Sequence, residues 1–95
     1  MKNFSTDHAC VACGRSGNGT TCYHHLYTKR VRRDLQYTDF NLIPVCMEHH
    51  AEFHNKGTFH MAEKYDGVSE FLIRMGWLYD DYREKYYHPK AQNSL

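Results

Sequence analysis

The sequence predicts a small α+β domain that a metal ion holds together, and three observations lead to that prediction. The chain has 95 residues, a size at which one apolar core gives only marginal stability. Two pairs of potential metal ligands lie far apart, one near the N-terminus and one in the middle of the chain. Stretches with the alternation of strands come before stretches with the spacing of helices. We therefore expect a single domain over residues 1–95.

The predicted strands lie in the first half of the chain. Residues 1–9 have no strong pattern, and residues 10–14 (CVACG) predict a tight turn that leads into a glycine-rich stretch. Residues 20–27 alternate in character and are rich in Thr, Tyr and Cys, which predicts a strand. A basic loop follows, and residues 40–45 predict a second short extended segment.

The second half is predicted to be helical. A helix is expected over residues 47–55, with a proline before it and a glycine after it, and a short helix over 59–65. A longer helix is expected over 69–87, because apolar residues recur there at spacings of three and four. This stripe consists of Phe71, Met75, Leu78, Tyr82 and Tyr86. The core is therefore expected over 10–57 and a helical extension over 59–87, with a flexible tail over 88–95.

The net charge of +1 conceals an asymmetry along the chain. Residues 14–33 contain five basic residues and no acidic ones, whereas residues 34–95 contain ten acidic and six basic residues. A local basic patch attracts a polyanion more than the average charge suggests, although a solvated loop would explain the same residues. The residues predicted to contact nucleic acid are Lys29, Arg30, Arg32 and Arg33.

Four residues have the spacing of a structural zinc site. Cys10 and Cys13 are separated by two residues, and so are Cys46 and His49, which lets each pair turn two ligands toward one ion. Such a closed set of four ligands leaves no open coordination position, so we expect a structural Zn²⁺. Cys22 could replace His49 as a ligand, but its place within a strand favours a buried apolar role.

The remaining histidines predict a second site. His50 and His54 are four residues apart and share one face of the predicted helix, away from the zinc ligands. His24 or His25 can complete this site, because adjacent residues of a strand point in opposite directions. One imidazole of that pair would bind a metal ion and the other would remain available as a base.

These residues carry a resemblance to a known family. The order CxxCG, HHL, basic loop and DFNLIPVCMEHHAEFH resembles the HNH endonucleases, which have the ββα-metal or His-Me finger fold. The resemblance covers residues 10–57, and the continuation GTFHMAEKYDGVSEFLIRMG is similar to small phage-type HNH proteins linked to recombination. It implies an α+β fold, a small zinc-stapled ββα-metal core with an added C-terminal helix, that acts as a metal-dependent DNA endonuclease.

The resemblance also implies a role for each site residue. His25 would be the general base, Asn41 would brace the loop between the two strands, and His50 would bind the catalytic metal. His24 would bind the catalytic metal at a position where the family often has Asp or another metal ligand, and His54 would be a third ligand or a phosphate contact. An all-imidazole site favours Mn²⁺, Co²⁺, Ni²⁺ or Zn²⁺ over Mg²⁺ more than a carboxylate site does.

The expected partner is DNA, and the expected location is the cytoplasm, that of the host cell if the chain is phage-encoded. The N-terminal residues have no apolar region typical of a signal peptide, and no apolar run reaches the length of a membrane span. We therefore expect reduced thiols and no membrane partner. The sequence does not indicate the oligomeric state.

Three functions can be compared with these residues. A non-catalytic zinc-stapled module for DNA or protein binding would need only the first site. A metal hydrolase for other substrates would need a carboxylate in an HExxH-like position, which is absent from the sequence. Phosphodiester hydrolysis needs an activated water, a cation and attraction for the backbone, which the second site and the basic loop would supply. We therefore expect an endonuclease of low sequence specificity or one directed by DNA structure.

Overall fold

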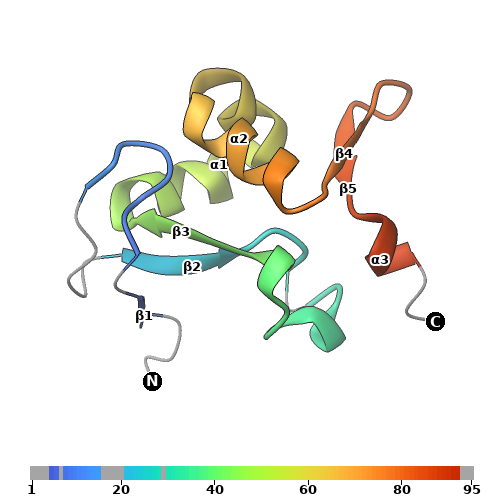
Figure 1. The fold of residues 1–95 in the computed structure, drawn as a ribbon, viewed down its shortest axis with the longest axis horizontal. Helices are drawn as coiled ribbons and strands as arrows, with labels where there is room; N and C mark the ends of the chain where they lie inside the picture. Colours follow the sequence, from blue (N-terminus) through green and yellow to red (C-terminus); the bar gives the residue numbers. More distant parts are fainter. Residues whose placement is uncertain (1–4, 7, 16–20, 29, 93–95) are drawn as a thin grey trace.

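The computed structural model of the chain describes residues 5–6, 8–15, 21–28 and 30–92. It shows a small α+β fold with two antiparallel sheets (Figure 1). The larger sheet has the strand order β1–β2–β3, which are Ser5–Thr6, Thr21–His25 and Leu42–Cys46. The smaller sheet pairs β4 with β5, which are Leu78–Asp80 and Lys85–Tyr87. Among the described residues, no helix is both long enough and apolar enough to cross a membrane.

The pairing of β2 with β3 decides which side chains face the first helix. His24 lies opposite Ile43 and Cys22 lies opposite Val45. Since alternate residues of a strand share a face, these four side chains leave the sheet on the same side. Ile43 and Val45 are completely buried there, and the ring of His24 lies 4.5 Å from that of Phe53. This face therefore forms the core and positions one histidine within it.

The helix α1 spans Met47–Lys64 but is interrupted at Gly57, which has φ 88° and ψ 168°. Glycine adopts this left-handed backbone without the steric cost that a Cβ atom brings. The predicted end of the first helix at this glycine is confirmed as a break in the backbone. The first part of α1 packs on β2 and β3, and α2, which spans Asp66–Arg74, packs against α1 (Figure 1).

The carboxylate of Glu52 ties the two parts of α1 together across this break. It accepts hydrogen bonds from the Tyr65 hydroxyl at 2.8 Å and from Lys64 Nζ at 3.1 Å, and it lies 3.1 Å from His60 Nε2. The bond from Tyr65, followed by the one from Lys64, lowers the pKa of Glu52 from its ordinary 4.5 to about 2. The ring of Tyr65 also lies 4.8 Å from that of His49, so this network supports a potential metal ligand.

The structure does not contain the helix predicted over residues 69–87. The helix α2 ends at Arg74, and Gly76 has φ 93°, a backbone conformation that a helix cannot continue through. A β-hairpin follows, and Glu84 in its turn has φ 56°. The apolar stripe is accordingly divided, and Tyr82 is 95% exposed. The helical spacing was misleading because it takes no account of a glycine that ends the helix.

The tail predicted to be flexible over residues 88–95 is folded where the structure describes it. Pro89–Gln92 form the short helix α3. His88 and Ala91 are only 4% and 1% exposed, and the ring of His88 stacks on that of Phe40 at 3.7 Å. The described part of the tail is therefore packed against the domain, while the last three residues of the chain lie outside the described part.

Replacing Glu52 with Gln is expected to make the free energy of unfolding less dependent on pH in the acid range. A carboxyl group whose pKa is lowered in the folded state stabilises that state above its ordinary pKa, and the contribution is lost as the pH falls from about 4.5 toward 2. Urea unfolding from neutral to acid pH would give the difference in free energy between wild type and Glu52→Gln. That difference should vanish near pH 2.

The matched control is Glu63→Gln, since Glu63 is an exposed carboxylate of the same helix. Its difference from wild type should stay small and change little over the same pH range. A Glu52→Gln difference that remained constant with pH would contradict the assigned network.

Candidate metal centres

Four sulfur and nitrogen ligands meet where β3 ends and α1 begins. Cys46 is the last residue of β3, and His49 lies in the first turn of α1. Cys10 and Cys13 approach from the N-terminal turn, which is closed by a hydrogen bond from the Gly14 amide to the Cys10 carbonyl at 2.7 Å. The four ligand atoms all lie within 4.8 Å of one another. The predicted convergence of the two pairs is thus present in the fold.

A zinc ion fits the spacing of these four atoms. Bond lengths of about 2.3 Å to sulfur and about 2.0 Å to nitrogen give tetrahedron edges of about 3.8 Å between sulfurs and about 3.5 Å between sulfur and nitrogen. The Sγ atoms of Cys13 and Cys46 are 3.9 Å apart. His49 Nδ1 lies 3.6 Å from Cys10 Sγ and 3.2 Å from Cys46 Sγ. The cluster could therefore hold a metal such as zinc.

The surroundings of Cys10 favour the thiolate that a metal binds. Burial raises the pKa of its thiol, but backbone hydrogen bonds from Cys46, Cys13 and Ala12 outweigh this effect, and the net pKa is lowered. Cys10 and Cys46 are 2% and 0% exposed, so both sulfurs lie inside the domain. An ion at this position would connect the N-terminal turn to the core.

The second cluster consists of three imidazoles between β2 and α1. The rings of His24, His50 and His54 have centroids 4.8–5.2 Å apart, and one nitrogen from each lies within 4.8 Å of the others. His50 and His54 are successive residues on one helix face, and His24 faces them from the sheet. The structure thus brings together the three residues predicted to hold a catalytic metal.

The burial of His24 and the groups around it favour the neutral imidazole, which could coordinate a metal ion. The residue is 7% exposed, and its Nδ1 atom has no hydrogen-bond partner among the described residues. Burial, and then the charges of His50, His54 and His25, lower the pKa of His24 to about 3. Its ring is therefore neutral above mildly acidic pH, which is the form that coordinates a metal ion.

His25 is held by the loop that connects β2 to β3. Its Nε2 atom lies 3.0 Å from the carbonyl oxygen of Gln36. A carbonyl only accepts hydrogen bonds, so Nε2 carries the proton and Nδ1 carries the lone pair of the neutral ring. His25 is also close enough to His50 to contribute, after burial and His54, to the lowered pKa of His50. Sequence reasoning missed Gln36 because it acts through its backbone, which leaves no side-chain signal.

Asn41 is buried at the base of the same loop and holds both of its ends. Its Oδ1 accepts a hydrogen bond from the Tyr27 amide at 2.6 Å. Its Nδ2 donates to the carbonyl oxygens of Tyr27 and Leu35 at 3.0 and 3.1 Å. With 0% exposure it has no contact with solvent, so any influence on catalysis would be through loop geometry.

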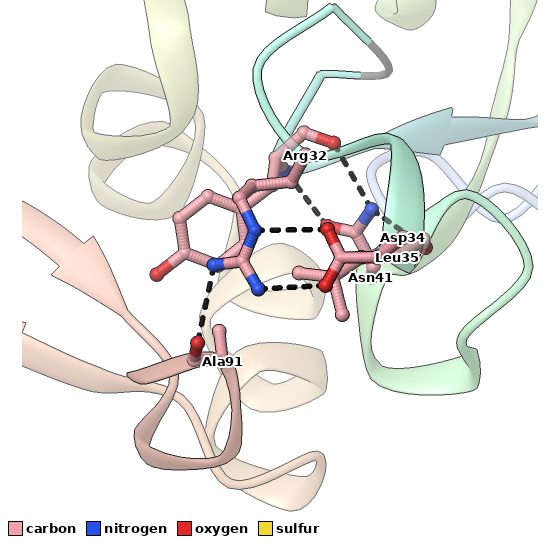
Figure 2. Close-up of polar contacts among 6 residues, drawn as sticks. Arg32, Asp34, Leu35, Asn41 and Ala91 are labelled. Atoms are coloured by element: carbon pink, nitrogen blue, oxygen red, sulfur yellow. Dashed lines mark hydrogen bonds and ion pairs between the residues drawn. The ribbon is translucent and has the colours of Figure 1, made fainter. Parts of the chain in front are cut away.

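The structure places Arg32 differently from the prediction that it contacts phosphates. Its Nε and Nη2 atoms donate to the carboxylate of Asp34 at 3.0 and 2.8 Å, and Nη1 donates to the Ala91 carbonyl at 3.1 Å (Figure 2). These bonds use three of the five N–H donors of the guanidinium within the fold itself. Arg30 and Arg33 are exposed and form no ion pair with the described residues. Lys29 lies outside the described residues.

Cys22 lies beside the second cluster rather than the first. Its Sγ atom is 3.3 Å from His50 Nδ1 and 3.9 Å from Met47 Sδ, and the residue is only partly buried. The prediction of a buried apolar role is therefore wrong, since the thiol contacts a polar ring. The first cluster contains His49 and not Cys22, so His49 is the fourth potential ligand there.

Comparison with known proteins does not assign the chain to a family. A scan against models of protein families, together with searches of curated proteins and of solved structures, found no match. The arguments for a function accordingly depend on the geometry and chemistry of the two clusters.

Replacing Cys46 with Ser is expected to remove the bound metal and to unfold the domain. The free energy of metal binding at such a site is also free energy of folding, because the unfolded chain has no preformed site. Elemental analysis should find about one zinc per wild-type chain and much less in the variant, whose circular dichroism should show lost structure.

Cys22→Ser is the matched control, because it makes the same substitution outside the cluster. It should keep both the zinc and the fold. A metal-free wild-type protein that unfolds at the same temperature as the metal-bound one would contradict the structural role of the ion.

Proposed function

We propose that this chain is a metal-dependent DNA endonuclease of the HNH type. His25 is its general base, and His24, His50 and His54 hold the catalytic divalent ion. The observation that carries the proposal is that two adjacent histidines at the end of β2, His24 and His25, have different surroundings. One faces a cluster of ligands, and the other is oriented by a backbone carbonyl.

The protein groups divide the work of phosphodiester hydrolysis. Because Nε2 of His25 donates to the Gln36 carbonyl, the ring accepts a proton from the attacking water at Nδ1. The same hydrogen bond stabilises the imidazolium that forms, since its Nε2–H bond remains in place. A divalent cation held by His24, His50 and His54 would supply positive charge that stabilises the phosphate and the leaving oxygen.

The expected all-imidazole ligand set bears on the choice of ion. Imidazole suits Mn²⁺, Co²⁺, Ni²⁺ and Zn²⁺, whereas Mg²⁺ prefers oxygen ligands. Only His54 of the three is exposed, so solvent and a phosphate approach from its side of the cluster. We therefore place the substrate phosphate next to His54 and expect transition metals to support cleavage better than Mg²⁺.

DNA attraction comes from the exposed part of the basic loop. Arg30 and Arg33 are exposed on the loop that also presents the Gln36 carbonyl to His25. Contacts with phosphates position a protein on DNA but carry no sequence information. This arrangement supports binding of low sequence specificity close to the proposed base.

His25→Ala is expected to fold and to bind DNA and metal normally but to cleave very slowly. Removal of a general base typically lowers the rate by about 10²- to 10⁴-fold and leaves metal affinity unchanged. Single-turnover cleavage of a supercoiled plasmid, measured across a panel of divalent metals, tests the rate. Calorimetry on the zinc-loaded protein tests the second metal site.

His24→Ala should also be inactive, but because the second ion binds more weakly. Higher metal concentration should then partly restore His24→Ala and should leave His25→Ala unchanged. His8→Ala is the matched control, because His8 is exposed and belongs to neither cluster. A His25→Ala protein that cleaves at the wild-type rate would rule out the assignment and favour a binding module without catalysis.

Arg30→Ala and Arg33→Ala are each expected to weaken binding to all DNA sequences by a similar factor. Each lost phosphate contact should reduce the slope of log affinity against log salt concentration by about 1. Fluorescence anisotropy with two unrelated duplexes at several salt concentrations measures both quantities. An unchanged slope would show that these side chains are only solvated, and a change in preference between duplexes would show that they read bases.

A further inference from the structure

The C-terminal segment, defined here as Trp77–Ala91, holds both ends of the loop 32–41. At the start of the loop, Arg32 Nη1 donates to the Ala91 carbonyl at 3.1 Å (Figure 2). At its end, Trp77 Nε1 donates to the Phe40 carbonyl at 2.7 Å. Ala91 and Trp77 are 1% and 5% exposed, the bond from Trp77 is buried, and the bond from Arg32 is partly buried.

His88 adds three further contacts between this segment and its surroundings. Its ring stacks on Phe40, and its amide donates to the Tyr27 hydroxyl at 3.2 Å. Its Nε2 atom donates to the Met75 carbonyl at 2.8 Å, which fixes the ring in place. Gly76 makes room for that ring, since a Cβ atom there would lie 3.1 Å from His88 Nε2.

The loop held in this way is the one that orients the proposed base. Gln36, whose carbonyl contacts His25, lies within a series of short turns. The Leu35 amide bonds to the Arg32 carbonyl at 3.1 Å, and the Gln36 amide bonds to the Arg33 carbonyl at 3.2 Å. A shift at Arg32 can therefore reach Gln36, whose carbonyl positions the His25 ring, through either of these two neighbouring hydrogen bonds.

We propose that the C-terminal segment is a clamp that fixes the loop 32–41 for catalysis, and that Arg32 is a positioning residue which acts on His25 through the loop. This inference rests on the proposed endonuclease function. The guanidinium suits the task because its planar fork binds the Asp34 carboxylate through two atoms while the third nitrogen reaches Ala91.

Arg32→Lys separates the clamp from a direct contact with DNA, because lysine keeps the charge but cannot form the fork. The clamp predicts that single-turnover cleavage at saturating DNA falls on the order of 10- to 100-fold, as expected for a misplaced catalytic group. DNA affinity and its salt dependence should stay at wild-type values. Arg74→Lys, the same substitution at an exposed arginine of α2, should leave the rate unchanged. Wild-type cleavage by Arg32→Lys would overturn the proposal.

A second measurement tests the clamp even if the chain cleaves no DNA. Hydrogen exchange at the Leu35 and Asn41 amides, which bond within the loop, should become faster in Arg32→Lys and remain unchanged in Arg74→Lys. Equal exchange in the two variants would overturn the clamp, whereas an inactive wild type with the expected exchange would overturn only the endonuclease.

Tyr27→Phe provides a variant that leaves the guanidinium intact. It removes the hydroxyl that accepts the His88 amide, while the backbone bonds between Tyr27 and Asn41 remain. We expect a smaller fall in cleavage rate and faster exchange in the same loop. If Arg32→Lys does not fold, normal cleavage and exchange in Tyr27→Phe would overturn the proposal.

Discussion

The position of α1 relative to the sheet depends on the four ligands gathered at its first turn. Cys46 ends β3 and Met47 begins α1, so no connecting residue can adjust the angle between strand and helix. The N-terminal turn reaches this junction through Cys10 and Cys13, which a metal such as zinc would hold against it. In a domain of this size a metal ion contributes stability that the apolar core alone does not provide. His50 and His54 lie further along the same helix, and their approach to His24 follows from that junction.

The proposed active site is thus held by elements that are independent of one another. His24 and His25 are adjacent in β2, yet the first faces α1 and the second contacts the loop before β3. The loop is braced from inside by Asn41 and from outside by the C-terminal segment. A strand that ends in two histidines can therefore offer a ligand to one side and a base to the other. Both roles are compatible with the regular alternation of side chains along a β-strand.

The sequence predicted the features that depend on the spacing of residues close together in the chain. The spacing of Cys10, Cys13, Cys46 and His49 and the interval between His50 and His54 reflect how ligands converge on an ion or share a helix face. The C-terminal part could not be predicted in this way. Its aromatic residues have helical spacing, but Gly76 ends the helix and Glu84 takes a turn conformation that Glu rarely adopts. Likewise, a basic run does not reveal which arginine has an internal partner, because Ala91 lies 59 residues from Arg32.

The second cluster is difficult to explain by stability alone. A buried polar atom without a partner costs about 1–3 kcal/mol, and His24 Nδ1 is such an atom among the described residues. An apolar side chain at this position would pack against Phe53 without that cost. The first cluster could already hold an ion that connects the N-terminal turn to the core. Where a sequence breaks the rules of packing without benefit to the fold, function is the usual reason. A metal ion that accepts the lone pairs of the three imidazoles would remove the cost, which supports a chemical role for this cluster.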